Sequence, residues 1–124
     1  MLVVVIDDDA DVLEVHRAFL EAGGYEVRTA SCGVSGVRLV RETLPSAVVC
    51  DMCMPGLSGQ EVILLLKSQP ATSHIPVVVV TGHCEEEFVG IGDAFMRKPV
   101  LCAELLMKVE ALTIKRLELK PAIC

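Results

Sequence analysis

The sequence predicts an α/β domain built around a five-stranded parallel sheet with helices on both faces. Short, β-branched apolar runs alternate with helix-like segments along the chain, and this alternation favours parallel strands joined by right-handed crossovers. Hydrophobic residues make up 52% of the chain and aromatic residues only 3%, which is typical of an aliphatic sheet buried on both faces. Because 124 residues suit one core, we expect a single domain over residues 1–124.

Five apolar runs are short enough to be buried strands. The first of them, residues 3–6, reads VVVI and stops abruptly at three aspartates. Turn residues, such as Gly23-Gly24 and Pro45, separate the later runs from the segments before them. The expected strands are residues 2–6, 25–28, 47–50, 77–81 and 94–98.

Polar caps mark the starts of three predicted helices. Asp9 is expected to cap a helix over residues 11–22, Ser31 one that ends near residue 42, and Ser58 one that ends near residue 68. A longer helix is expected over about residues 101–119. The expected apolar faces are Val12, Val15 and Phe19 in the first helix and Leu101, Leu105, Val109 and Leu112 in the last.

Polar side chains stand at the ends of four predicted strands. Asp7 and Asp8 follow the first strand, Asp51 follows the third, Thr81 ends the fourth, and Lys98 ends the fifth. Ligands of open α/β sheets bind outside the carboxyl ends of the strands. We therefore expect these side chains to converge on one edge of the sheet.

The run Asp7-Asp8-Asp9 needs an explanation, because like charges about 4 Å apart near a protein surface repel by a few kcal/mol. Carboxylates from two neighbouring strands make a hard-oxygen site for Mg²⁺ (or Mn²⁺), which offsets the repulsion and often bridges to phosphate. Lys98 adds a positive charge suited to phosphate, and Thr81 adds a hydrogen-bonding hydroxyl. Asp51 is then a candidate nucleophile that forms an aspartyl phosphate.

Charge and hydropathy exclude several other classes of protein. A net charge of −6 argues against direct binding of nucleic acid, since phosphate contacts need Lys and Arg. No apolar run reaches the length of a membrane span, and no basic segment precedes the first apolar run as in a signal peptide. We therefore expect a cytoplasmic domain without membrane contact, whose six cysteines are mostly reduced.

At this point the chain resembles the response-regulator receiver domains of two-component signalling. The resemblance rests on VVVIDDD, VVCDMCMPGLSGQE, IPVVVVTG and FMRKPV, in this order and at near-normal spacing. It implies a flavodoxin-like sheet with strand order 2-1-3-4-5. It also implies that the domain accepts a phosphoryl group, with Mg²⁺ bound, from a histidine kinase or a histidine phosphotransfer domain.

The resemblance assigns roles to individual positions. Asp51 matches the phosphoacceptor, and Asp7 and Asp8 match the acidic metal-binding pair, with Asp8 favoured as the direct ligand. The backbone carbonyl of Cys53 matches a further metal ligand. Thr81 and Phe95 match the switch hydroxyl and the switch aromatic, and Lys98 matches the lysine of the site. The positions of Cys53 and His83 tune the lifetime of the phosphate in this family.

Such a domain is not a conventional enzyme, although it catalyses its own phosphorylation and dephosphorylation. Its output is a changed surface, read by effector or kinase domains outside this chain. The segment between Thr81 and Lys98 is shorter than receivers usually have, and Gly90 and Gly92 interrupt it. We therefore expect the helix between the last two strands to be a single turn or missing.

Other interpretations stay open at this stage. Cys50-x-x-Cys53 and His83-Cys84 end neighbouring strands, which allows a zinc site or a redox pair, although Cys50 is expected to pack in an apolar layer. His83 is either a lid residue or a solvated loop residue, and His16 is expected on the surface. The rival functions are a degenerate receiver that only binds other proteins, a phosphate-ester hydrolase and a flavodoxin-like cofactor binder.

Overall fold

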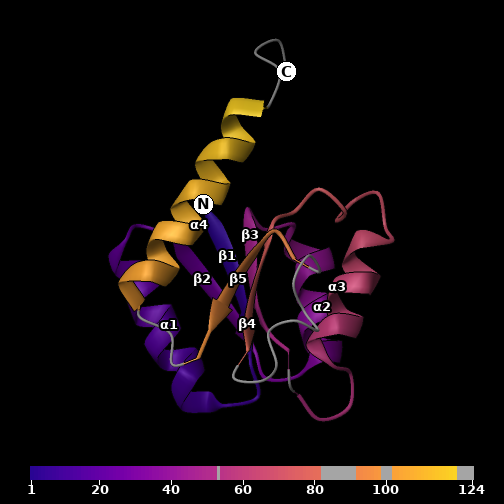
Figure 1. Ribbon diagram of the computed structural model, residues 1–124. Helices are drawn as coiled ribbons and strands as arrows, with labels where there is room; N and C mark the ends of the chain where they lie inside the picture. Colours follow the sequence, from indigo (N-terminus) through magenta and orange to yellow (C-terminus); the bar gives the residue numbers. More distant parts are fainter. Residues whose placement is uncertain (53, 82–91, 99–101, 120–124) are drawn as a thin grey trace.

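The computed structural model describes residues 1–52, 54–81, 92–98 and 102–119. Its centre is a sheet of five parallel strands in the order β2-β1-β3-β4-β5 (Figure 1). This order confirms the predicted topology. The strands are β1 (Leu2–Ile6), β2 (Glu26–Ala30), β3 (Ala47–Asp51), β4 (Val77–Thr81) and β5 (Ala94–Arg97).

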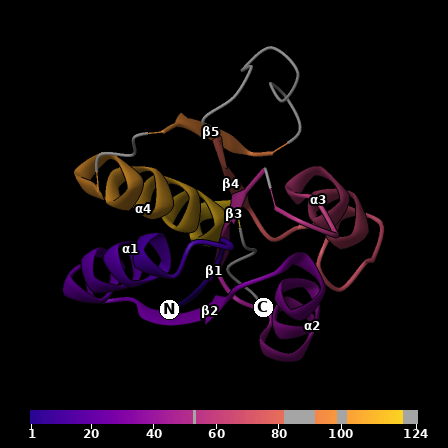
Figure 2. The same ribbon diagram turned by 90° about the horizontal axis from the view of Figure 1, so that it is seen from below.

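Helices cover both faces of the sheet. The four helices of the described residues are α1 (Ala10–Ala22), α2 (Gly33–Thr43), α3 (Gly59–Lys67) and α4 (Cys102–Leu119). Figure 2 shows α1 and α4 on one face and α2 and α3 on the other. Within the described part of the chain, no helix has both the length and the apolar character needed to cross a bilayer.

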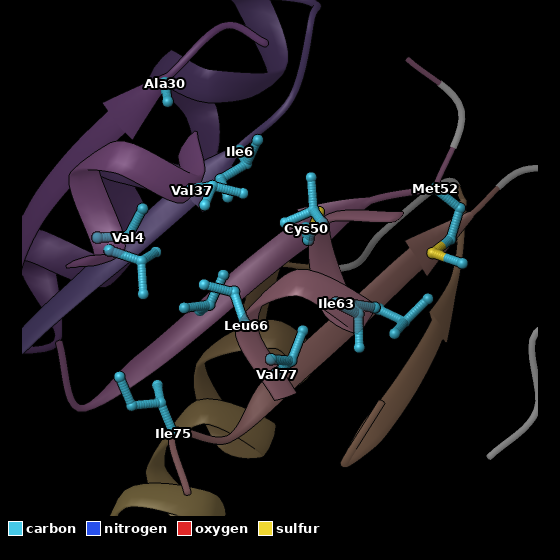
Figure 3. Packing of buried hydrophobic residues seen from close by; sticks show 14 of the residues in the cluster. Val4, Ile6, Ala30, Val37, Cys50, Met52, Ile63, Leu66, Ile75 and Val77 are labelled. Carbon is cyan, nitrogen blue, oxygen red and sulfur yellow. The ribbon is translucent and has the colours of Figure 1, made fainter. Parts of the chain in front are cut away.

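Side chains of the three central strands alternate between two apolar layers, as the period of a strand requires. One layer joins α2 and α3 to the side of the sheet that carries Val4, Ile6, Cys50 and Val77 (Figure 3). The other joins Leu13 and Leu20 of α1 and Leu105 and Val109 of α4 to the opposite side. Burial on both faces explains why β1, β3 and β4 are continuous apolar runs.

Two of the three predicted helix caps are confirmed. The Asp9 carboxylate accepts hydrogen bonds from the N–H groups of Asp11 and Val12, and Ser58 forms a capping box with Glu61. The predicted cap at Ser31 is wrong. The cap of α2 is Cys32, whose side chain makes no capping hydrogen bond. A thiol is a weak hydrogen-bonding group, so the sequence favoured the neighbouring serine.

The predicted apolar face of α1 is also wrong. Val15 and Phe19 remain about half exposed, and the buried residues of α1 are Leu13, His16 and Leu20. Both sets recur at helical spacing, but the second contains a histidine and was therefore the weaker apolar stripe. His16 was expected on the surface. It is buried because α1 turns a different face toward the sheet from the one predicted.

Gly36 of α2 marks close packing against the sheet. A Cβ atom at Gly36 would lie 2.6 Å from Cδ1 of Ile6. The missing side chain therefore lets α2 approach β1. The predicted shortening of the helix between β4 and β5 falls largely on residues 82–91, which lie outside the described residues.

Candidate functional site

The carboxyl ends of the parallel strands bring the predicted polar residues to one edge of the sheet. Ile6 pairs with Cys50, so Asp7 and Asp51 follow on neighbouring strands. Asp51 pairs with Val80, the residue before Thr81. The backbone N–H of Lys98 donates to the carbonyl oxygen of Thr81 at 2.8 Å, which carries the pairing of β4 and β5 beyond the end of β5.

Asp7, Asp51 and Lys98 extend the same face of the sheet. Asp7 follows the alternation of Val3 and Val5, Asp51 follows that of Ala47 and Val49, and Lys98 follows that of Met96. The Asp7 N–H donates to the carbonyl oxygen of Ala30 at 3.1 Å, so the backbone stays extended at this point. The three polar side chains therefore lie at the end of the apolar layer that α1 and α4 cover.

Three carboxylates form a cluster at this edge. One oxygen each of Asp7, Asp8 and Asp51 lies within 4.8 Å of the others. Asp7 and Asp51 are buried, whereas Asp8 is exposed. The Asp9 carboxylate caps α1 and is not part of the cluster. Buried carboxylates with an exposed third partner fit a hard cation such as Mg²⁺, which prefers oxygen ligands and retains water.

Lys98 supplies positive charge to the two buried carboxylates. Its Nζ lies 3.5 Å from Oδ2 of Asp7 and 3.5 Å from Oδ1 of Asp51. Burial lowers the pKa of Lys98, but the carboxylates of Asp51 and Asp7 outweigh that effect and raise it above its usual value. The ammonium group is therefore charged at neutral pH and lies beside the Asp51 carboxylate.

The two predicted switch residues lie on β4 and β5. Thr81 ends β4 and is fully buried. Phe95 pairs with Val79 in the sheet and packs, partly buried, against the apolar layer under α2 and α3. Thr81 thus lies at the carboxyl edge of the sheet, and Phe95 lies two residues before the end of β5.

Gly59 is a residue of the site that the sequence analysis missed. A Cβ atom here would overlap the carbonyl oxygen of Asp51 and would lie 2.6 Å from Cα of Met52. The Gly59 N–H also donates to the carbonyl oxygen of Met52 at 3.1 Å. The start of α3 therefore packs directly on the backbone that carries Asp51. The available signal was the small residue directly after the Ser58 cap.

The cysteine and histidine pairs receive only a partial test. Cys53, His83 and Cys84 lie outside the described residues. Cys50 is fully buried in an apolar layer, as predicted, and burial raises the pKa of its thiol, with Asp51 and Asp7 adding to the effect. A buried thiol of this kind is a small hydrophobic group rather than a thiolate ligand.

Comparison with known proteins agrees with this geometry. The sequence matches the family model described as "Response regulator receiver domain" over residues 3–110. The chain belongs to this family. Receivers act in two-component signalling, in which histidine kinases or phosphotransfer proteins are their partners.

The similar proteins include a transcriptional regulatory protein and a further response regulator. The chain is 34% identical over 117 residues to the transcriptional regulatory protein PrrA of Mycobacterium leprae, with 92% of this chain and 50% of PrrA covered. It is 36% identical over 115 residues to the response regulator MprA of a Mycobacterium species, with 89% and 49% covered. This receiver thus spans about half the length of these relatives.

A solved receiver domain from Clostridium thermocellum has a closely similar fold. It superimposes with a TM-score of 0.88 at 29% identity and covers 96% of this chain and 98% of its own. The shared fold extends over almost the whole receiver.

Proposed function

We propose that this chain is one receiver domain over residues 1–124 that accepts a phosphoryl group on Asp51. The donor is the phosphohistidine of a histidine kinase or of a histidine phosphotransfer domain. The observation that carries this proposal is the convergence of Asp7, Asp8, Asp51 and Lys98 at one edge of the sheet. An Asp51 that were only a structural residue would need neither the acidic neighbours nor the lysine.

The carboxylates of Asp7, Asp8 and Asp51 would hold one Mg²⁺ ion. The resemblance to receivers adds the backbone carbonyl of Cys53 as a further ligand. When bound, the ion supplies positive charge to the equatorial oxygens of the transferring phosphoryl group. Mn²⁺ has similar ligand preferences and is expected to substitute. The exposed side of Asp8 leaves this position open to water.

The reaction is an in-line displacement at phosphorus. An oxygen of the Asp51 carboxylate forms the new P–O bond while the P–N bond to the donor histidine breaks, and the departing imidazole takes up a proton. The Lys98 ammonium offsets the charge on the phosphoryl oxygens. Hydrolysis of the aspartyl phosphate later returns Asp51, so this domain catalyses both steps without being a conventional enzyme.

Phosphorylation then shifts a two-state equilibrium. The Thr81 hydroxyl hydrogen-bonds a phosphoryl oxygen, and Phe95 moves inward into the space this opens, which changes the surface near β5. Effector or kinase domains outside this chain read that surface. Cys53 and His83 flank the site in sequence and tune the lifetime of the phosphate.

We expect a cytoplasmic domain of this charge to make no direct contact with nucleic acid or membrane.

The test is phosphorylation by acetyl phosphate, a small phosphodonor that needs no partner protein. We expect Mg²⁺-dependent addition of one phosphoryl group that hydroxylamine removes, as for an acyl phosphate. Asp51→Asn should abolish the addition, and Asp11→Asn, a change at an exposed aspartate of α1, should not affect it. A folded protein that is never modified would contradict the proposal and favour a receiver that only binds other proteins.

A further inference from the structure

We propose that His16 makes the packing of α1 acid-sensitive, so that protonation of its imidazole loosens α1 from the sheet. This device is separate from the phosphorylation chemistry and does not depend on Asp51 being the phosphoacceptor.

His16 occupies a core position. It is 5% exposed and lies on the buried face of α1 between Leu13 and Leu20, both of which belong to the apolar layer shared with α4. Its Nδ1 atom is fully buried and has no hydrogen-bond partner in the described structure. A buried polar atom without a partner is costly, and a second proton on this ring would add a buried charge to that cost.

The charges near His16 come from the functional edge of the sheet. Asp7 at the end of β1 favours the protonated ring, and Lys98 after β5 opposes it. The residues that α4 contributes to this layer are apolar: Leu105 and Val109, with Leu106 and Leu112 partly buried beside them. On α1 itself, Arg17 pairs with Glu14 and Glu21 on the exposed side of the helix.

The balance of these effects favours the neutral ring. Burial is the largest influence and lowers the pKa of His16 below its ordinary value of 6.5, although Asp7 partly compensates. The unfolded chain therefore binds more protons than the folded chain as the pH falls below about 6.5. The contribution of the neutral His16 ring to the stability of the fold is complete above this pH and is lost progressively below it.

Local opening offers the least disruptive route to protonation. Release of α1 from the sheet exposes the imidazole to water while the layer under α2 and α3 stays packed. Openings of single helices are common low-energy excursions of folded proteins. We therefore expect acid to increase the opening of α1 in particular.

The first experiment measures unfolding by urea between about pH 5 and pH 8. His16→Leu and His16→Gln remove the titrating group with an apolar and a polar side chain, and His74→Gln is the matched control at an exposed histidine. We expect the ratio of the unfolding constant of the unmodified protein to that of either His16 variant to increase as the pH falls below the ordinary pKa of histidine. The increase should be up to about tenfold per pH unit. His74→Gln should retain the full pH dependence.

The second experiment locates the opening by amide hydrogen exchange, corrected for the intrinsic effect of pH. We expect amides of α1 to lose protection in acid while those of α3 do not, and we expect His16→Leu to remove this difference. The same pH dependence of unfolding with and without His16 would overturn the proposal. Loss of protection spread evenly over all helices would also overturn it.

Discussion

The Nζ atom of Lys98 lies 3.5 Å from a carboxylate oxygen of Asp7 and 3.5 Å from one of Asp51. One ammonium group, carried by the residue after β5, thus reaches across the end of β4 to the ends of β3 and β1. Both carboxylates are buried, and Lys98 is about one-third exposed. The contact therefore combines a structural effect with a position next to the proposed phosphoacceptor.

Replacing Lys98 by Met should separate these two roles. In the absence of metal we expect the free energy of unfolding to fall by about 1 kcal/mol, since the ion pairs are only partly buried. The rate of phosphorylation by acetyl phosphate should fall by about a hundredfold, because a charge that stabilises the transferring group is lost. Lys108→Met on α4 is the control. An unchanged rate in a folded Lys98→Met protein would remove Lys98 from the proposed chemistry.

The raised pKa of Lys98 predicts a specific alkaline dependence of stability. Asp51 and Asp7 hold the folded-state pKa above the ordinary value of 10.5, despite the opposing effect of burial. The stabilisation by the charged lysine is therefore complete at pH values below the ordinary pKa of lysine. It is lost as the pH rises through the pKa of Lys98 in the folded state. Measured by denaturation, the free energies of unfolding of the unmodified protein and of Lys98→Met should become more similar as the pH rises in this range. A constant difference between them would contradict the prediction.

Metal binding should stabilise the fold through the carboxylate cluster. A ligand that binds only the folded state adds about 2.7 kcal/mol at a hundredfold excess over its Kd. We expect Mg²⁺ to raise the melting temperature, chelation to reverse the effect, and Asp8→Asn to weaken Mg²⁺ binding by at least about tenfold. Asp9→Asn should retain the Mg²⁺ effect, since Asp9 caps α1. Equal loss in both variants would mean that the cluster is not the binding site.

The strand-end residues could be predicted from sequence because the topology of a parallel sheet determines their position. Each apolar run marked a strand, and the residue that ended it marked the common edge. Asp7, Asp8, Asp51 and Lys98 meet there regardless of the exact length of the intervening helices. The cap at Ser58 was predictable for a similar reason, since its capping box lies within four consecutive residues.

Which face of α1 packs against the sheet could not be predicted in the same way. Val12, Val15 and Phe19 form one apolar stripe, and Leu13, His16 and Leu20 form another on the same helix. Only packing against the sheet and α4 decides between them. The role of Gly59 could not be predicted either. Its contact with the backbone of Asp51 is a tertiary contact between the start of α3 and the end of β3, which no local sequence pattern indicates.

Gly59→Ala should disturb the site without touching its charges. Alanine favours helix formation by up to about 1 kcal/mol relative to glycine, so an open position would gain stability. Here the added Cβ would meet the backbone of Asp51 and Met52, which cannot turn away. We expect a net loss of about 1–3 kcal/mol and slower phosphorylation. Gln60→Ala is the control at an exposed position of the same helix, and a stabilised Gly59→Ala protein would contradict this packing.

The two cysteines Cys32 and Cys50 should react at very different rates. Cys32 is exposed, and hydrogen bonding with Ser35 lowers the pKa of its thiol, whereas burial raises that of Cys50. Since the thiolate is the reactive form, iodoacetamide should label Cys32 first and Cys50 only after unfolding. Peptide mapping by mass spectrometry gives the order, and early labelling of Cys50 in the folded protein would show that its layer is accessible.

The most direct test of Asp51 as the phosphoacceptor is titration of the protein with beryllofluoride in the presence of Mg²⁺, followed by amide NMR. Beryllofluoride on an aspartate stands in for the labile aspartyl phosphate. We expect Mg²⁺-dependent shifts at Asp51, Thr81 and Lys98 that extend to Phe95 and are absent in Asp51→Asn. Shifts that persist in Asp51→Asn, or a folded protein that does not respond, would contradict the assignment of Asp51 as the phosphoacceptor.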